Sequence, residues 1–306
     1  HALPLGLFVG QMAGFIVHFV LVRRQFPDMP LHPALRVPMV LLKYSLPLGF
    51  GEFVASFLIR SALWMVMLFL GPEKAGAFGI MVTISNALQT IHVGFTPILT
   101  PVVAGMEKQR LSTDLKFVYS YCVFMVTLIQ LLIGFFIVLF PSEILSIAGK
   151  DFIVQPEALG ILLLVHLGTG FGGLSVLVLK GMGKSLYTLI MDTISLGLTL
   201  GMGYLLIPRF GLVGAALAML SSTLFSAIVN NGYLYKMGFR LYSSKLISQV
   251  LWIVALVAFY IAVNTGKLPM VLWQKIVAYL VIVGLLGLYW KLVKKYFSVS
   301  AISNKK

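Results

Sequence analysis

Residues 179–229 read LKGMGKSLYTLIMDTISLGLTLGMGYLLIPRFGLVGAALAMLSSTLFSAIV. Two apolar spans, Leu186–Ile207 and Leu212–Tyr235, are separated there only by Pro208–Gly211. About 20 apolar residues are enough for a helix to cross the hydrocarbon layer of a membrane. The proline removes a backbone donor and the glycine permits a tight reversal, while the small residues Gly214–Ala216 allow close helix packing. The stretch therefore predicts two antiparallel transmembrane helices.

The same pattern of apolar spans and short polar breaks extends over the whole chain. Hydrophobic residues make up 59% of the sequence and charged residues 10%, whereas soluble domains contain about 25% charged residues. Because lipid offers no hydrogen-bond partners to the backbone, such spans must be helical. The sequence predicts an all-α polytopic membrane protein with about nine transmembrane helices. The spans are Leu3–Val22, Leu42–Leu70, Gly76–Val103, Phe117–Phe140, Ala158–Leu179, Leu186–Ile207, Leu212–Tyr235, Leu246–Val263 and Val271–Tyr289.

The basic residues predict which breaks face the cytoplasm. If Arg23 and Arg24 lie on the cytoplasmic side, 17 of the 23 basic residues fall in cytoplasmic breaks and five in outer breaks, with Arg60 inside a span. This bias is the one that the positive-inside rule describes for short loops. The net charge of +14 is therefore interpreted as a topology signal, with no nucleic-acid partner and a cytoplasmic C-terminus.

The span Leu42–Leu70 carries the strongest polar pattern. Ser45, Gly49, Glu52, Ser56 and Arg60 recur every three or four residues and share one helix face. A charged residue at the depth of Arg60 costs about 2.5–3.5 kcal/mol to insert and marks a functional pathway by default. A direct pair between Glu52 and Arg60 would have to bridge about 12 Å along the helix. The pattern therefore favours a functional role over an internal ion pair.

Two other spans carry weaker polar faces. Asn86 and Thr90 lie on a small-residue face of Gly76–Val103, where helix packing is the common alternative to a binding site. Asp192, near the cytoplasmic end of Leu186–Ile207, has two open interpretations: a proton or cation site, or an interfacial carboxylate. His166 is interpreted as a hydrogen-bonded packing histidine.

Motifs of known enzymes are missing from the sequence. The single cysteine, Cys122, excludes an intrachain disulfide, and we find no zinc-ligand spacing, nucleophile elbow or paired aspartate motif. The glycine run Gly168–Gly173 lies within an apolar span and predicts close helix packing, not a nucleotide loop. We therefore expect no catalytic residue, metal or cofactor.

One family resemblance rests on the opening stretch. The turn at Gly183-Lys184, the apolar span after it and the segment Pro208–Ala218 resemble the multidrug/oligosaccharidyl-lipid/polysaccharide (MOP) exporter superfamily, and look closest to its polysaccharide-unit (O-antigen, Wzx-type) flippase branch. Leu46-Pro47, read as the start of one helix, and Gly76–Phe78, read as the opening of the next, agree with that branch.

The resemblance implies two six-helix lobes and, in some members, two further helices. Residues 42–236 would form the second lobe and 246–292 two additional transmembrane helices. Residues 1–22 would be the last helix of an otherwise missing first lobe, joined by a cytoplasmic linker at 23–41, with a cytoplasmic tail at 293–306. The chain would then be a C-terminal fragment of the family chain.

The resemblance also implies a function. The first hypothesis is a transporter, not an enzyme, that flips a polyprenyl-pyrophosphate-linked oligosaccharide across the bacterial inner membrane by alternating access. Arg60 would bind the pyrophosphate or an acidic sugar, because arginine suits bidentate phosphate recognition. Ser56, Asn86 and Thr90 would bond sugar hydroxyls, and Glu52 or Asp192 would couple transport to protons or sodium. Membrane lipids, a polysaccharide polymerase and chain-length machinery would be its partners.

Two alternatives remain open at this point. The first is a multidrug or metabolite antiporter of the same superfamily that is coupled to a cation. The second, which the sequence supports less, is an intramembrane glycosyl polymerase or transferase.

Overall fold

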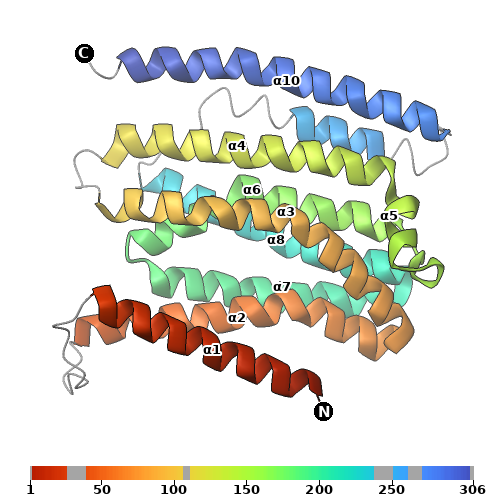
Figure 1. Ribbon diagram of the computed structural model, residues 1–306, viewed down its shortest axis with the longest axis horizontal. Helices are drawn as coiled ribbons and strands as arrows, with labels where there is room; N and C mark the ends of the chain where they lie inside the picture. Colours follow the sequence, from red (N-terminus) through yellow and green to blue (C-terminus); the bar gives the residue numbers. More distant parts are fainter. Residues whose placement is uncertain (1, 26–38, 106–110, 238–250, 261–270, 304–306) are drawn as a thin grey trace. The chain divides into compact units, whose positions relative to one another are not determined.

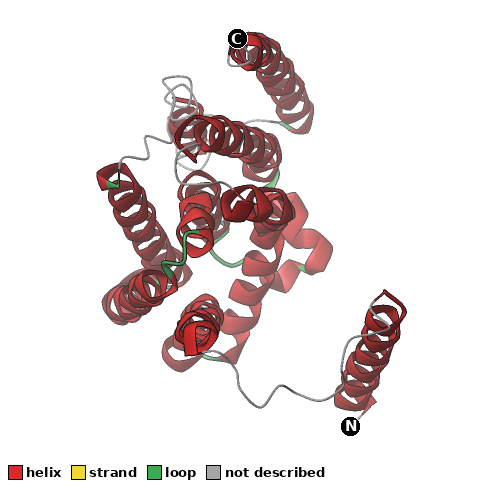
Figure 2. Cartoon of the chain, turned by 90° about the vertical axis from the view of Figure 1, so that its left-hand side faces the viewer, coloured by secondary structure: helices red, strands yellow, loops and turns green. Residues whose placement is uncertain are grey.

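The computed structural model describes residues 2–25, 39–105, 111–237, 251–260 and 271–303 (Figure 1). The chain divides into two units, His1–Lys43 and Tyr44–Lys306. Throughout the described ranges every regular element is a helix, as Figure 2 shows. The predicted all-α fold class is thereby confirmed.

The first unit contains one long apolar helix. Helix α1 spans Ala2–Gln25 and has Arg23 and Arg24 in its last turn, which agrees with the first predicted span. Most of the predicted linker at 23–41 lies outside the described residues.

The second unit contains the remaining long helices. Seven helices within the described residues are long and apolar enough to cross a membrane, and they match seven of the nine predicted spans. Its elements are α2 (Met39–Leu70, whose first turn lies in the first unit), α3 (Pro72–Gly105), α4 (Leu111–Leu139), α5 (Pro141–Ala148), a 3₁₀ turn (Lys150–Phe152), α6 (Glu157–Gly181), α7 (Ser185–Phe210), α8 (Leu212–Lys236) and α10 (Leu272–Ser303).

The last two predicted spans are described unequally. Of the span Leu246–Val263, the structure describes the ten-residue helix Leu251–Tyr260, and the rest lies outside the described residues. Helix α10 continues past the predicted end of its span at Tyr289 to Ser303. The predicted tail at 293–306 is therefore helical over its described part.

The interpretation of Leu46-Pro47 as the start of a helix is wrong. Leu46-Pro47 was expected to open the helix, but α2 begins at Met39 and Pro47 lies inside it. A proline removes one backbone hydrogen bond without necessarily ending a helix, and such prolines are tolerated within membrane helices.

The α7–α8 hairpin confirms the prediction from the opening stretch. Gly211 adopts φ +63° between the two helices, a left-handed conformation that glycine adopts without strain. The Gln155 side chain accepts a hydrogen bond from the Leu212 amide at 2.7 Å, so it satisfies one of the free donors at the start of α8. A Cβ atom at Gly214 would lie under 3.0 Å from the Leu206 carbonyl oxygen, and the two backbones touch there.

Helix α6 is the centre of the second unit. It packs against α3, α4 and α8, while α7 packs against α8, and α10 against α4 (Figure 1). Gly168 and Gly172 bring α6 close to α8, because a Cβ atom at either would press on Thr223 or Ala227. The glycine run is thus a packing surface, as predicted.

The helix Leu251–Tyr260 and α10 are fastened to this bundle at its α5 end. The Tyr260 hydroxyl donates to the Glu157 carbonyl oxygen, and Lys275 on α10 forms an ion pair with Glu143 at 2.6 Å. Further along α10, Trp290 stacks on Phe124 of α4 with ring centroids 5.8 Å apart.

Candidate functional site

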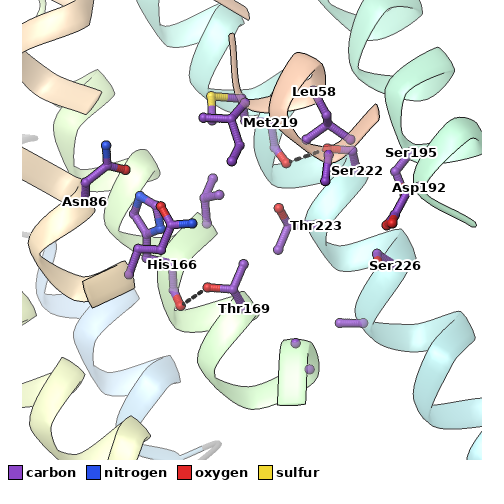
Figure 3. Close-up of a pocket in the computed structure, with 18 of the residues that line it drawn as sticks. Leu58, Asn86, His166, Thr169, Asp192, Ser195, Met219, Ser222, Thr223 and Ser226 are labelled. Atoms are coloured by element: carbon purple, nitrogen blue, oxygen red, sulfur yellow. Dashed lines mark hydrogen bonds between the residues drawn. The ribbon is translucent and has the colours of Figure 1, made fainter. Parts of the chain in front are cut away.

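Five helices of the second unit line an open-sided cavity of about 210 Å³ (Figure 3). Helices α2 and α3 contribute one part of its wall, α6 another, and α7 and α8 the remainder. Its polar lining residues are Asn86, Gln89, His166, Thr169, Asp192, Ser195, Ser222, Thr223 and Ser226. Apolar side chains such as Leu58, Val82 and Met219 complete the wall. The site is therefore amphipathic, as ligand pockets usually are.

Among the described residues that line the cavity, Asp192 is the one with a charged side chain. No lysine or arginine is among the described residues that line it. In Figure 3, Asp192 lies with Ser195 and Ser226 on one side, and Asn86 and His166 lie on the other. Since Asp192 is the only charged group in the described lining, the cavity is suited to a cation.

The position of Asp192 follows from the packing of α7 on α2. A Cβ atom at Gly51 of α2 would lie 3.9 Å from the Asp192 Oδ2 atom. Gly51 is therefore a close neighbour of the carboxylate, at ordinary van der Waals distance. The buried face of α7, which includes Ser195 and Thr199, turns Asp192 toward the edge between α2 and the cavity.

Hydroxyl groups lie close to this carboxylate in sequence and in space. Ser195, one turn along α7, is 4% exposed, and its Oγ atom has no hydrogen-bond partner within the described structure. Ser226 of α8 accepts a hydrogen bond from Asn230 Nδ2 at 2.9 Å. An unpaired buried hydroxyl costs free energy, so Ser195 is available to bond a ligand held at Asp192.

His166 forms a hydrogen bond to the neighbouring helix α3, which agrees with its interpretation as a hydrogen-bonded packing histidine. Its Nε2 atom lies 3.1 Å from Ser85 Oγ, and the Ser85 hydroxyl donates to the Val82 carbonyl oxygen at 2.9 Å. A hydroxyl has one proton, so Nε2 must carry the hydrogen that it shares with Ser85. His166 Nδ1 is then an acceptor, and it has no partner in the described part of the chain.

We expect Ser85→Ala to destabilise the protein by about 1–3 kcal/mol, because it leaves His166 Nε2–H buried without an acceptor. The midpoint of thermal unfolding in detergent should fall. Thr83→Ala on the same helix is the control, since Thr83 is exposed and bonds only to the Gly79 carbonyl in its own helix. Equal midpoints for the two variants would show that the Ser85–His166 contact does not stabilise the wall.

The structure brings two of the predicted site residues into the cavity, Asn86 and Asp192. Ser56, Arg60 and Thr90 are exposed and lie outside its lining. The Thr90 hydroxyl instead donates to the Asn86 carbonyl oxygen at 3.1 Å, within α3.

Glu52 lies outside the described lining of the cavity and forms an ion pair with a residue of another helix. The Lys180 ammonium group donates to Glu52 Oε1 at 2.5 Å and links α6 to α2. The two residues are 128 positions apart along the chain, so the pair leaves no local signal in the sequence.

Helix α8 supplies the functional residues that the sequence interpretation missed. Ser222, Thr223 and Ser226 all line the cavity. The available signal was the cluster of hydroxyl residues inside an otherwise apolar span, SSTLFS at 221–226. A hydroxyl in a membrane helix is also commonly a packing residue, so this signal alone does not single out a site. Groups of three or more potential metal ligands are not found among the described residues.

The fold is similar to that of solved structures at low sequence identity. No protein-family model and no curated protein matches the chain. A multidrug-resistance MATE-family transporter of the MOP superfamily, solved in an outward-facing conformation, matches with TM-score 0.50 and 18% identity over 72% of this chain and 52% of its own. A MATE structure in complex with MaD5 matches with TM-score 0.52 and 21% identity over 64% of this chain and 46% of its own.

These likenesses establish a shared fold, and the chain spans about half the length of the structures it matches. The helices are those of a multi-pass membrane protein. The likeness extends to the fold alone, and neither structure is described as a polysaccharide flippase.

Proposed function

We propose that the protein is a membrane transporter that exports an amphipathic organic cation in exchange for protons or sodium ions. The observation that carries this proposal is the cavity in which Asp192 is the only charged residue of the described lining. The likeness to a transporter described as conferring multidrug resistance supports the same choice. This function is the alternative to the lipid-linked oligosaccharide flippase that the sequence first favoured.

The volume of the cavity limits how much of a substrate molecule fits inside it. Pockets that enclose drug-sized ligands usually measure about 300–1,000 Å³, whereas this one measures about 210 Å³. It would therefore hold the cationic end of the substrate, with apolar contacts from Leu58 and Met219. The bulk of the molecule would extend beyond these helices.

Exchange follows from competition for a single carboxylate. A proton or a sodium ion at Asp192 would neutralise the charge that holds the organic cation, so the two cannot bind there together. Alternating access of the site to the two sides of the membrane would then convert this competition into antiport.

The experiment that tests the proposal is transport into sealed vesicles. The purified protein is reconstituted, and accumulation of tetraphenylphosphonium is measured with and without an imposed proton or sodium gradient. We expect gradient-dependent accumulation that vesicles without protein do not show. Translocation of a lipid-linked oligosaccharide, with no movement of the organic cation, would contradict the proposal.

The flippase remains a second candidate because of one observation on α2. Arg60 and Ser56 are both exposed on α2 and outside the cavity, so they could bind a pyrophosphate group too large for the cavity. The flippase function would place the protein in a bacterial inner membrane beside a polysaccharide polymerase and chain-length machinery, with its C-terminus in the cytoplasm.

Arg60→Ala separates the two candidates. An organic-cation transporter should keep its tetraphenylphosphonium transport within about twofold, since surface substitutions away from a site usually change energies by less than 0.5 kcal/mol. A flippase should lose oligosaccharide translocation, because Arg60 would no longer bind the pyrophosphate. The measurement compares both activities in matched vesicles, with Arg60→Lys to test for bidentate recognition.

A further inference from the structure

The ion pair between Lys180 and Glu52 joins two helices at the edge of the cavity. Lys180 lies in the last turn of α6, and its Nζ atom is 2.5 Å from Glu52 Oε1 on α2. The Lys180 side chain is 19% exposed and that of Glu52 64%. An ion pair contributes little to stability when one partner is as exposed as Glu52. Stabilising the fold therefore does not explain why the pair lies at this place.

Asp192 lies beside this pair. Its Oδ2 atom is 3.9 Å from the Cβ position of Gly51, the residue before Glu52. The carboxylate of Asp192 interacts electrostatically with both Lys180 and Glu52. The ammonium group of Lys180 is thus paired with one carboxylate, that of Glu52, and lies within electrostatic range of a second, that of Asp192 in the cavity lining.

We propose that Lys180 is a positioning residue that competes with the exported cation for Asp192. The proposal rests on the proposed function, because it takes Asp192 to be the cation-binding group. In the structure Lys180 is paired with Glu52. In a second arrangement the flexible lysine side chain turns toward Asp192 and neutralises it, and an organic cation that binds Asp192 displaces Lys180 back to Glu52.

Glu52 then has a defined task, which is to hold Lys180 away from the cavity. The position of Lys180 at the C-terminus of α6 favours a positive charge in either arrangement. The ammonium group resembles the charged end of the cargo, so only one of the two can occupy Asp192 at a time. Release of the cargo is assisted by a competitor that is part of the chain.

The test uses binding of tetraphenylphosphonium to the purified protein, with two variants expected to act in opposite directions. Lys180→Met removes the competitor, and we expect binding to tighten about tenfold. Glu52→Gln frees Lys180 to pair with Asp192, and we expect binding to weaken about tenfold. The double variant should bind as tightly as Lys180→Met, because Glu52 acts only through Lys180.

A purely structural ion pair predicts a different result. Loss of either partner would then change binding in the same direction, or leave it unchanged, and either outcome overturns the inference. Thermal unfolding of each variant checks that it is folded, and Lys180→Gln replaces Lys180→Met if the latter does not accumulate. Asp192→Asn keeps the two proposals apart. If Asp192→Asn loses binding while Glu52→Gln binds as the unaltered protein does, only the role of Lys180 is overturned. If Asp192→Asn binds the cation fully, the proposed function itself is overturned.

Discussion

Asp192→Asn is expected to weaken tetraphenylphosphonium binding about 100-fold, since losing one partner of a desolvated charge pair costs about 2–5 kcal/mol. The asparagine keeps the size and hydrogen-bonding capacity of the side chain but removes its charge. No other acidic residue is present in the described lining of the cavity, so no neighbour can take over the role. Gradient-driven transport should be lost together with binding.

Two control variants make this result specific. Asp192→Glu keeps the charge and should retain binding to a measurable degree. Asp151→Asn removes an exposed carboxylate in the 3₁₀ turn Lys150–Phe152, and should leave binding unchanged. If Asp192→Asn bound the cation as the unaltered protein does, the cavity would not be the cation site.

Gly214→Ala is expected to destabilise the protein by about 3 kcal/mol, at the upper end of the usual cost of overpacking. The added methyl group would lie under 3.0 Å from the Leu206 carbonyl oxygen and the Ile207 amide nitrogen. These are backbone atoms of α7, so no side chain can turn aside to make room. The α7–α8 hairpin would have to open, and Asp192 and Ser226 would separate.

Gly232→Ala is a matched control on the same helix. A Cβ atom at Gly232 would meet nothing within 4 Å, and alanine is favoured over glycine in a helix by about 1 kcal/mol. We expect a lower yield and a lower unfolding midpoint for Gly214→Ala, and unchanged or improved values for Gly232→Ala. Equal behaviour of the two variants would contradict the close approach of α7 and α8.

Most of the fold is predictable from the sequence because each span is specified locally. Apolar length identifies the seven confirmed spans, and Gly211 and Gly214 identify the hairpin. The start of α2 is not predictable from Pro47, because a proline can lie inside a membrane helix as well as at its end. Within the described residues, the long-range packing at α6 follows from Gly168 and Gly172, which are visible as a run of glycines.

The site is less predictable because periodicity reveals a polar face without revealing what that face meets. Asn86 and Asp192 lie on predicted polar faces and reach the cavity. Arg60 lies on the most regular polar face of all, yet it is outside the cavity lining. The pair of Lys180 with Glu52 joins residues 128 positions apart, so neither segment alone predicts it.

The charge of the cavity also explains why the first functional hypothesis changes. Arg60 suggested an anionic substrate when it was considered as the deepest charge of its span. The structure places Asp192 in the cavity instead, so the sign of the expected substrate is reversed. The proposal of an exported cation follows from that placement.

Photo-crosslinking with a photoreactive organic cation tests most directly whether the cavity is the cation site. After irradiation of the protein in vesicles, peptide mass spectrometry locates the attached label. The cavity site predicts labels on α6 and α8 at Thr169, Met219 or Thr223, and their loss in Asp192→Asn. Labels confined to the exposed face of α2 around Ser56 and Arg60, unchanged in Asp192→Asn, would contradict it.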